Sequence, residues 1–342
     1  MPTIQSVISL LETIAPPGYQ ESYDNAGLIT GDAGSVVRGV LCCLDATEAV
    51  VAEAADRGCN LVVAHHPIVF RGLKKLSGGS YVERALIRAI REDIAIYAVH
   101  TNLDKVYDHG VNTRIAAQLG LQSVAVLSPS EPLQLLRATV TAAGADTLAA
   151  AWQEALPMGS VVSIPVETAD RSASLRRLEA VSGAGAVPQL LAMLRESGSS
   201  VGPAEQLELR QKDSRVGLGA VGYLPEPLPE TEFLALLKKR MKTPVVRHTA
   251  LRGKAVRKVA LCGGAGSFLL PAALRSGSDI FVTADYKYHE FFDADGKIVI
   301  ADIGHYESEQ FTIDLLREII SEKFPTFATL QTTIRTNPVL YF

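Results

Sequence analysis

One short apolar run ends in two adjacent histidines, and it limits the possible folds more than any other stretch of the chain. Residues Leu61 to Ala64 read Leu-Val-Val-Ala, and His65, His66 and Pro67 follow directly. A run this short and rich in β-branched residues predicts a buried strand, and the proline ends it. Because ligands of open α/β sheets gather at the carboxyl ends of strands, we expect both imidazoles to lie at a binding edge.

The segments around this run alternate between predicted strands and predicted helices. Strands are predicted at 36–44, 60–64 and 94–99, and helices at 47–57, 81–92 and 111–119. A second alternation has strands at 256–262, 279–283 and 297–301, followed by one long helix at 306–320. Such alternation is typical of a parallel or mixed sheet covered by helices, so the predicted fold class is α/β.

The sequence changes character between residues 133 and 212. The predicted elements there follow the order β-α-β-β-α-β, which is the ferredoxin-like split motif. This stretch contains no histidine and no cysteine. We therefore expect an inserted domain at 133–212 without metal chemistry of its own, inside a discontinuous metal-binding core formed by 1–132 and 213–342.

Charge and composition argue against several classes of function. The 342 residues carry a net charge of -4, which is no electrostatic footprint for nucleic acid or an anionic membrane. No apolar run reaches the roughly 18 residues that a membrane span needs, and the first ten residues lack the pattern of a secretion signal. The four cysteines have no metal-type spacing, which favours buried free thiols and a cytoplasmic protein.

Four groups of metal-ligating residues follow predicted strands. They are His65 with His66, His100 through Asp104, Asp285 through His289, and His305 with Glu309. Imidazole and carboxylate ligands suit zinc, iron, manganese or nickel, and this set excludes a thiolate zinc finger. Any one histidine alone is more simply explained as a satisfied polar residue at a sheet edge. The four groups together favour a metal site, in which a carboxylate could bridge two metal ions about 3.5–4 Å apart.

Two further stretches have alternative interpretations. Asp24 and Asn25 either form a turn or contribute to the site. The run Gly263 to Ser267 either cradles a phosphate at a helix N-terminus or forms a tight turn with close packing. The chain contains no Walker A motif and no H-E-x-x-H motif, which argues against chemistry led by those sites.

Several of these motifs occur together and in a fixed order. The order is Asp24-Asn25-Ala26-Gly27-Leu28, Ala64-His65-His66-Pro67, His100-Thr101-Asn102-Leu103-Asp104, Gly263-Gly264-Ala265-Gly266-Ser267, Thr283 through His289, and Gly304 through Glu309. This combination resembles the Nif-three-like proteins, commonly labelled GTP cyclohydrolase 1 type 2 homologues. The resemblance covers about residues 1–130 and 213–342.

The resemblance implies a two-lobed α/β core of mixed sheets flanked by helices, with a dinuclear metal site. It implies two divalent metal ions per subunit (zinc, iron, manganese or nickel). The ligands that it implies are His65, His66, Asp104, His305 and Glu309, with Glu309 as the bridge. It also implies a ring-shaped homohexamer, a trimer of dimers, and a middle domain like the PII or CutA fold.

The family label implies a hydrolase in which metal-activated water attacks a nucleotide-like substrate such as GTP. The same site chemistry allows phosphoester or amide hydrolysis. His100, Asp285 and His289 are candidates for acid–base or ligand-orienting roles. The alternative is a metal-binding regulatory, chaperone or scaffold protein without catalysis. The expected partners are other copies of the chain and a small-molecule substrate, with neither a membrane nor nucleic acid.

Overall fold

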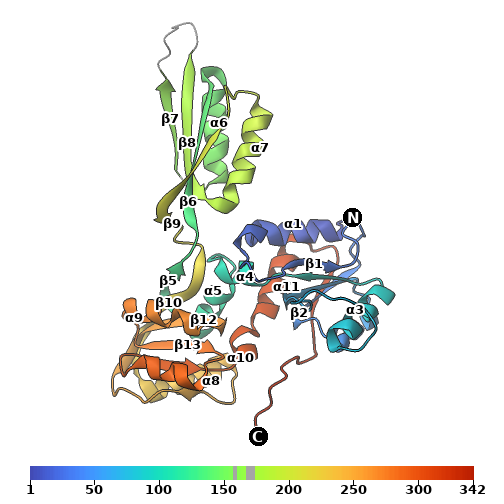
Figure 1. Ribbon diagram of the computed structural model, residues 1–342, viewed down its shortest axis with the longest axis vertical. Coiled ribbons are helices and arrows are strands. Elements are labelled where there is room, and N and C mark those ends of the chain that lie inside the picture. Colours follow the sequence, from blue (N-terminus) through green and yellow to red (C-terminus); the bar gives the residue numbers. More distant parts are fainter. Residues whose placement is uncertain (157–159, 167–173) are drawn as a thin grey trace. The chain divides into compact units, whose positions relative to one another are not determined.

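The computed structural model describes residues 1–156, 160–166 and 174–342, and these form two compact units (Figure 1). Unit 1 comprises Met1–Ser128 and Gly217–Phe342, and unit 2 comprises Pro129–Val216. Each unit has a hydrophobic core of its own. Within the described ranges, none of the helices combines the length and the apolar character that crossing a bilayer requires.

The first sheet of unit 1 has four parallel strands and one antiparallel edge strand. Its order is β1 (Gly27–Thr30), β4 (Ala95–Ala98), β3 (Leu61–His66), β2 (Gly39–Asp45) and β15 (Ala328–Gln331). Only β1 runs antiparallel to its neighbour among these pairs. The helices that belong to this part of unit 1 are α1 (Ile4–Ile14), α2 (Glu48–Asp56), α3 (Tyr81–Arg91) and α11 (Thr312–Lys323), with the 3₁₀ helix η1 (Pro17–Tyr19).

Apolar residues cover both faces of this sheet. Leu41 of β2 and Val62 of β3 face a core that α2 and α3 complete. Their neighbours Val40 and Val63 point to the opposite face and are buried as well. Strands that are buried on both faces read as continuous apolar runs rather than alternating ones. The apolar run before His65 has this continuous pattern because both of its faces are buried.

The second sheet of unit 1 has a parallel centre with antiparallel neighbours. Its order is β11 (Arg247–His248), β14 (Val299–Asp302), β13 (Ile280–Ala284), β12 (Ala255–Ala265), β10 (Gly217–Pro229) and β5 (Gln122–Pro129). Strands β12, β13 and β14 are parallel. The associated helices are α4 (Thr101–Lys105), α5 (Val111–Leu119), α8 (Glu230–Met241), α9 (Leu270–Arg275), η3 (Ser267–Leu269) and η4 (Tyr288–Ala294).

The prediction of a single long helix at 306–320 is wrong. The structure has α10 (His305–Glu309) and then α11 (Thr312–Lys323). Gln310 and Phe311 separate them, and Phe311, with φ -76° and ψ -5°, has a buried side chain. The periodic apolar pattern continues through this break, so the sequence alone gave no sign of it.

The carboxyl ends of the parallel strands in both sheets lie beside the same two pockets. Asp45 ends β2, His66 ends β3, and His100 follows β4 closely. In the other sheet, Asp285 follows β13 and His305 lies three residues beyond the end of β14. These residues line two adjoining pockets, so the rule that places ligands at carboxyl ends applies to both sheets at once.

The described part of unit 2 is an antiparallel sheet with two α-helices. Its elements are β6 (Pro132–Thr141), α6 (Ala142–Ala155), β7 (Ser160–Val166), β8 (Leu175–Gly183), η2 (Ala184–Ala186), α7 (Val187–Ser197) and β9 (Glu205–Lys212), and the strand order is β7-β8-β6-β9. Buried Trp152 donates a hydrogen bond to the Leu190 carbonyl over 3.2 Å. The ferredoxin-like assignment stays a prediction, and residues 157–159 and 167–173 of the predicted insertion lie outside the described residues.

Candidate metal centre

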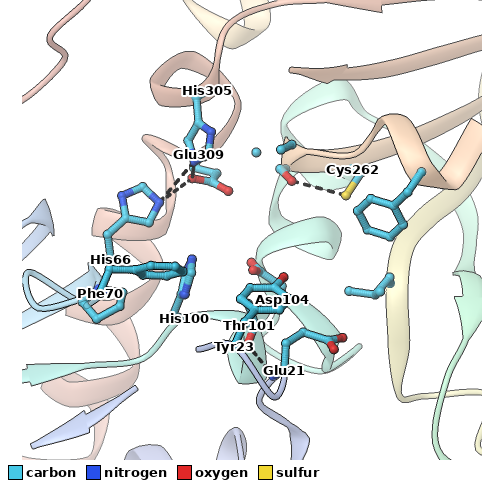
Figure 2. A pocket seen from close by; sticks show the side chains of 16 residues that line it. Glu21, Tyr23, His66, Phe70, His100, Thr101, Asp104, Cys262, His305 and Glu309 are labelled. Atoms are coloured by element: carbon cyan, nitrogen blue, oxygen red, sulfur yellow. Dashed lines mark hydrogen bonds and ion pairs between the residues drawn. The ribbon is translucent and has the colours of Figure 1, made fainter. Parts of the chain in front are cut away.

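A pocket of about 630 Å³ in unit 1 brings together residues from both sheets (Figure 2). His66, His100 and Asp104 come from the first half of the sequence, and His305 and Glu309 come from α10. The sequence separation between the two sets exceeds two hundred residues, so only the folded chain assembles them. The pocket volume lies within the range usual for small-molecule sites.

The first cluster consists of His66, His305 and Glu309. The Nε2 atoms of His66 and His305 lie 3.0 Å and 3.1 Å from the same oxygen, Glu309 Oε2. The two Nε2 atoms are 3.3 Å apart. Figure 2 shows both rings turned toward this carboxylate. Two nitrogens and one oxygen that converge in this way form a group with the spacing of metal ligands.

The second cluster consists of His65, Asp104 and Glu309. His65 Nε2 lies 3.6 Å from Asp104 Oδ1 and 3.9 Å from Glu309 Oε1. Glu309 therefore turns one oxygen toward each cluster. A third grouping joins His65 and His66 with His100. A carboxylate placed between two ligand clusters is what a bridging ligand requires.

Hydrogen bonding at His65 provides a test of whether the residues fit a metal ion. His65 Nδ1 lies 2.9 Å from the Val99 carbonyl, and because a carbonyl only accepts, this nitrogen is the donor. In the neutral ring, Nε2 is then an acceptor, and it faces the acceptor Asp104 Oδ1. Both atoms are buried and have no hydrogen-bond partner among the described residues. Unpaired buried acceptors are costly, and a cation between them would satisfy both, so the donor set fits a metal ion.

Carboxylates accept hydrogen bonds from the Nδ1 atoms of the other two imidazoles, His66 and His305. Asp45 Oδ1 accepts from His66 Nδ1 over 2.8 Å, and Asp285 Oδ2 accepts from His305 Nδ1 over 2.7 Å. Each contact leaves Nε2 directed at Glu309. Carboxylate–histidine pairs of this kind fix the ring orientation and the tautomer of metal ligands. Asp285 adopts φ +57°, a left-handed conformation that aspartate tolerates better than most residues.

The charges of this centre shift several pKa values. Burial lowers the pKa of His66, but hydrogen bonds to Asp45 and Glu309 outweigh it and raise the pKa to about 9. Burial also lowers the pKa of His305. The charge of Glu309 and the hydrogen bond to Asp285 outweigh burial and raise this pKa to about 11. Without a metal ion, both rings are therefore protonated at neutral pH.

The two remaining carboxyl groups of the ligand set shift in opposite directions. Burial raises the pKa of Asp104, and the charge of Glu309 adds to that effect. Burial would also raise the pKa of Glu309, but the charge of His305 and its hydrogen bond hold that pKa well below the usual range. Asp104 is thus the carboxylate that a metal-free site stabilises least.

The predicted catalytic residues lie in three different settings. His100 lines the pocket, and its Nδ1 lies 2.8 Å from Asp24 Oδ1. Burial raises the pKa of Asp24, but hydrogen bonds from His100 and Thr101 lower it to about 2, so this carboxylate is ionised. Asp285 orients His305. His289 is exposed on η4 and lines neither of the two pockets that contain His66 and His305, so its catalytic role stays a prediction.

Residues that the sequence analysis did not single out complete the site. Asp45 had one available signal, since it directly follows the strand predicted at 36–44. Near the C-terminus, Thr336 donates to the second oxygen of Asp45 over 2.5 Å. Asn337 donates to buried Glu307 over 2.8 Å. This segment thus contacts Asp45, which orients His66, and Glu307 of α10, and no local pattern in the sequence indicates either contact.

The glycine-rich run packs against the metal ligands. Gly263 N donates to Asn112 Oδ1 over 3.0 Å, and Gly264 N donates to Ser308 Oγ over 2.9 Å. Gly264 has φ +60°, and a Cβ there would lie 2.5 Å from Glu309 Oε1. Both amide groups are therefore engaged within the protein. Of the two interpretations of this run, close packing is the one that the structure supports.

Comparisons with known proteins agree with this fold and this site. The sequence model of the Duf34/NIF3 (NGG1p interacting factor 3) family matches residues 2–338. A Halalkalibacterium halodurans protein named GTP cyclohydrolase 1 type 2 homolog is 30% identical over 367 aligned positions, covering 98% of each chain. A Bacillus subtilis protein of the same name is 30% identical, covering 93% of this chain and 92% of the relative.

A solved structure extends this comparison to the fold. The crystal structure of a Bacillus cereus protein related to NIF3 matches with a TM-score of 0.83 at 28% identity, covering 100% of this chain and 99% of that chain. The predicted resemblance and the predicted α/β fold class are thus confirmed.

Proposed function

Because the chain belongs to the Duf34/NIF3 (NGG1p interacting factor 3) family, we propose that it is a hydrolase that uses two divalent metal ions. The observation that carries this proposal is the position of Glu309. Its Oε2 lies 3.0 Å from His66 Nε2, and its Oε1 lies 3.9 Å from His65 Nε2. The two histidines that are adjacent in the sequence would thereby serve different metal ions, with Asp104 and His305 completing one cluster each.

Metal ions bound there would polarise a substrate oxygen and acidify water, which is the chemistry of metal-assisted hydrolysis. The protein's own residues would orient and transfer protons. Asp45 and Asp285 hold the ligand rings, so that their Nε2 atoms cannot rotate away. The Nδ1–H group of His100 donates a hydrogen bond to the ionised Asp24, which leaves Nε2 as an acceptor in the neutral ring. We propose His100 as the general base, since it lines the pocket beside both clusters.

The names of the relatives suggest GTP as the first substrate to test. Protein loaded with zinc, manganese or iron would be incubated with GTP and with panels of phosphoesters and amides, and bound metal would be measured in each sample. We expect metal-dependent product formation. Glu309→Ala should lose metal and turnover together, while His100→Gln should lose turnover and keep its metal. His248→Ala, an exposed histidine on β11, is the control.

The same experiment separates this proposal from its alternative. Two equivalents of tightly bound metal without turnover of any substrate would favour a metal-binding regulatory, chaperone or scaffold protein. Loss of metal in His100→Gln would make His100 a ligand rather than a base. The homohexamer implied by the family resemblance is likewise a proposal, and light scattering of the purified chain would test it.

A further inference from the structure

Three large aromatic side chains surround the pocket and remain exposed. Tyr23 is 63% exposed, Phe70 50% and Phe268 61%, and all three line the pocket. They come from three separate segments: the turn before β1, the loop after β3, and η3. The Tyr23 and Phe70 rings lie 6.3 Å apart, and Phe70 lies edge-on to His100 at 6.3 Å. Figure 2 shows Tyr23, Phe70 and His100 around one side of the pocket.

Such an arrangement needs an explanation, because exposed aromatic surface is unfavourable in water. Single exposed apolar residues are ordinary, whereas several that converge on one concavity mark a binding surface. Small-molecule pockets combine apolar walls with a few convergent polar groups. Here the polar groups are the two ligand clusters, and the aromatic side chains line the same pocket.

The charge of the pocket narrows the choice of ligand. Its charged lining residues are acidic or imidazole groups, and no lysine or arginine lines it among the described residues. Asp104 and Glu309 face the metal positions, and Glu21 pairs with Lys105 at 3.0 Å. A polyphosphate tail pointing away from the clusters would therefore find no cationic side chain on this wall. A flat uncharged ring would find aromatic partners.

We propose that this pocket selects substrates carrying an uncharged aromatic or heteroaromatic ring, which lies against Tyr23, Phe70 and Phe268. The reacting oxygen-bearing group of the same molecule reaches the clusters at Glu309. This inference rests on the proposed function, because the metal ions fix where the reacting group lies. It adds the class of substrate and three residues that determine specificity.

Matched chelators test the inference without any turnover. Acetohydroxamate and benzohydroxamate share the metal-binding group and differ in the ring. Calorimetric titration of zinc-loaded protein should give about ten-fold tighter binding for benzohydroxamate, because its ring adds an aromatic contact that acetohydroxamate lacks. Phe70→Leu and Tyr23→Leu should each reduce that ratio several-fold. Phe292→Leu is the matched control, since Phe292 is 67% exposed but lies outside this pocket.

The outcomes separate this inference from the proposed function. If the protein holds metal and binds both chelators equally, the inference fails and the metal site stands. If the protein holds no metal and binds neither, the proposed function fails and the inference fails with it. A third probe, benzohydroxamate with a carboxylate on the ring, should bind more weakly than the parent. Equal or tighter binding of that probe would overturn the requirement for an uncharged ring.

Discussion

Replacing Asp104 by asparagine should stabilise the metal-free protein while it weakens metal binding. Asp104 Oδ1 and His65 Nε2 are both buried, both acceptors, and 3.6 Å apart without a donor between them. The amide group of asparagine is nearly the same size and brings a donor to this place. The amide can therefore donate a hydrogen bond to His65 Nε2. The substitution also removes a buried carboxylate, whose pKa is raised by burial. A carboxylate is nevertheless the better ligand for a divalent ion.

The size of the effect follows from the cost of unpaired groups. A buried acceptor without a partner costs about 1–3 kcal/mol, so Asp104→Asn should raise the free energy of unfolding of metal-free protein by about that amount. For a unit of this size, each kcal/mol corresponds to about 2–4 °C in the melting temperature. Wild-type protein in metal at one hundred times its dissociation constant gains about 2.7 kcal/mol, and the variant should lose most of that gain.

Scanning calorimetry would measure four melting temperatures, those of the wild type and of Asp104→Asn, each with chelator and with zinc. We expect the order of stability to reverse: the variant melts higher in chelator, and the wild type melts higher in zinc. Asp56→Asn, at an exposed position on α2, controls for the general effect of removing a carboxylate. If Asp104→Asn melts below the wild type in chelator, the reasoning from unpaired acceptors is refuted, because the wild-type carboxylate would then be satisfied without metal.

Three further results are expected. Thr336→Val should weaken metal binding by about ten-fold, because it removes a support of the His66–Asp45 pair, whereas Thr333→Val in the same segment should leave it unchanged; competition with a fluorescent chelator measures both. Gly264→Ala should destabilise the protein more than Gly253→Ala in chemical denaturation: both glycines have positive φ, +60° and +70°, but only the first would place its Cβ 2.5 Å from a ligand oxygen. Metal binding at pH 7 should release protons from the two imidazoles whose pKa values are raised to about 9 and about 11, so affinity should rise from pH 7 toward pH 9. Calorimetry in buffers of different ionisation enthalpy would show this release, and a pH-independent affinity would contradict it.

The features that could be predicted from the sequence are the local ones. Short apolar runs buried on both faces stand out against polar helices, so β3 and its neighbours were recognisable. His65 and His66 were placed at a binding edge because strand ends in α/β folds have that property. His305 and Glu309 needed only the four-residue periodicity of a helix, which α10 provides over a single turn.

The features that escaped prediction depend on contacts between distant segments. Thr336 reaches Asp45 across 291 positions, and nothing near either residue signals the pairing. The left-handed backbone at Asp285 is another case, since its benefit is a hydrogen bond to a ring twenty positions away. The glycine-rich run was ambiguous for the same reason: its meaning depends on Glu309, which packs where a Cβ would otherwise lie.

The two clusters differ in what replaces a metal ion when none is bound. At the first, protonated His66 and His305 face Glu309 at 3.0 Å and 3.1 Å, so protons already neutralise the carboxylate. At the second, His65 and Asp104 have unpaired atoms and nothing to displace. Metal at the second position therefore relieves an existing cost, whereas metal at the first must compete with protons. We expect the position at His65 and Asp104 to fill first, with the smaller dependence on pH. Wild type and Asp104→Asn would each be titrated with one and then two equivalents of cobalt, and binding would be followed by absorption. We expect the absorption change of the first equivalent to be lost in the variant. Loss of the second step instead would reverse this order.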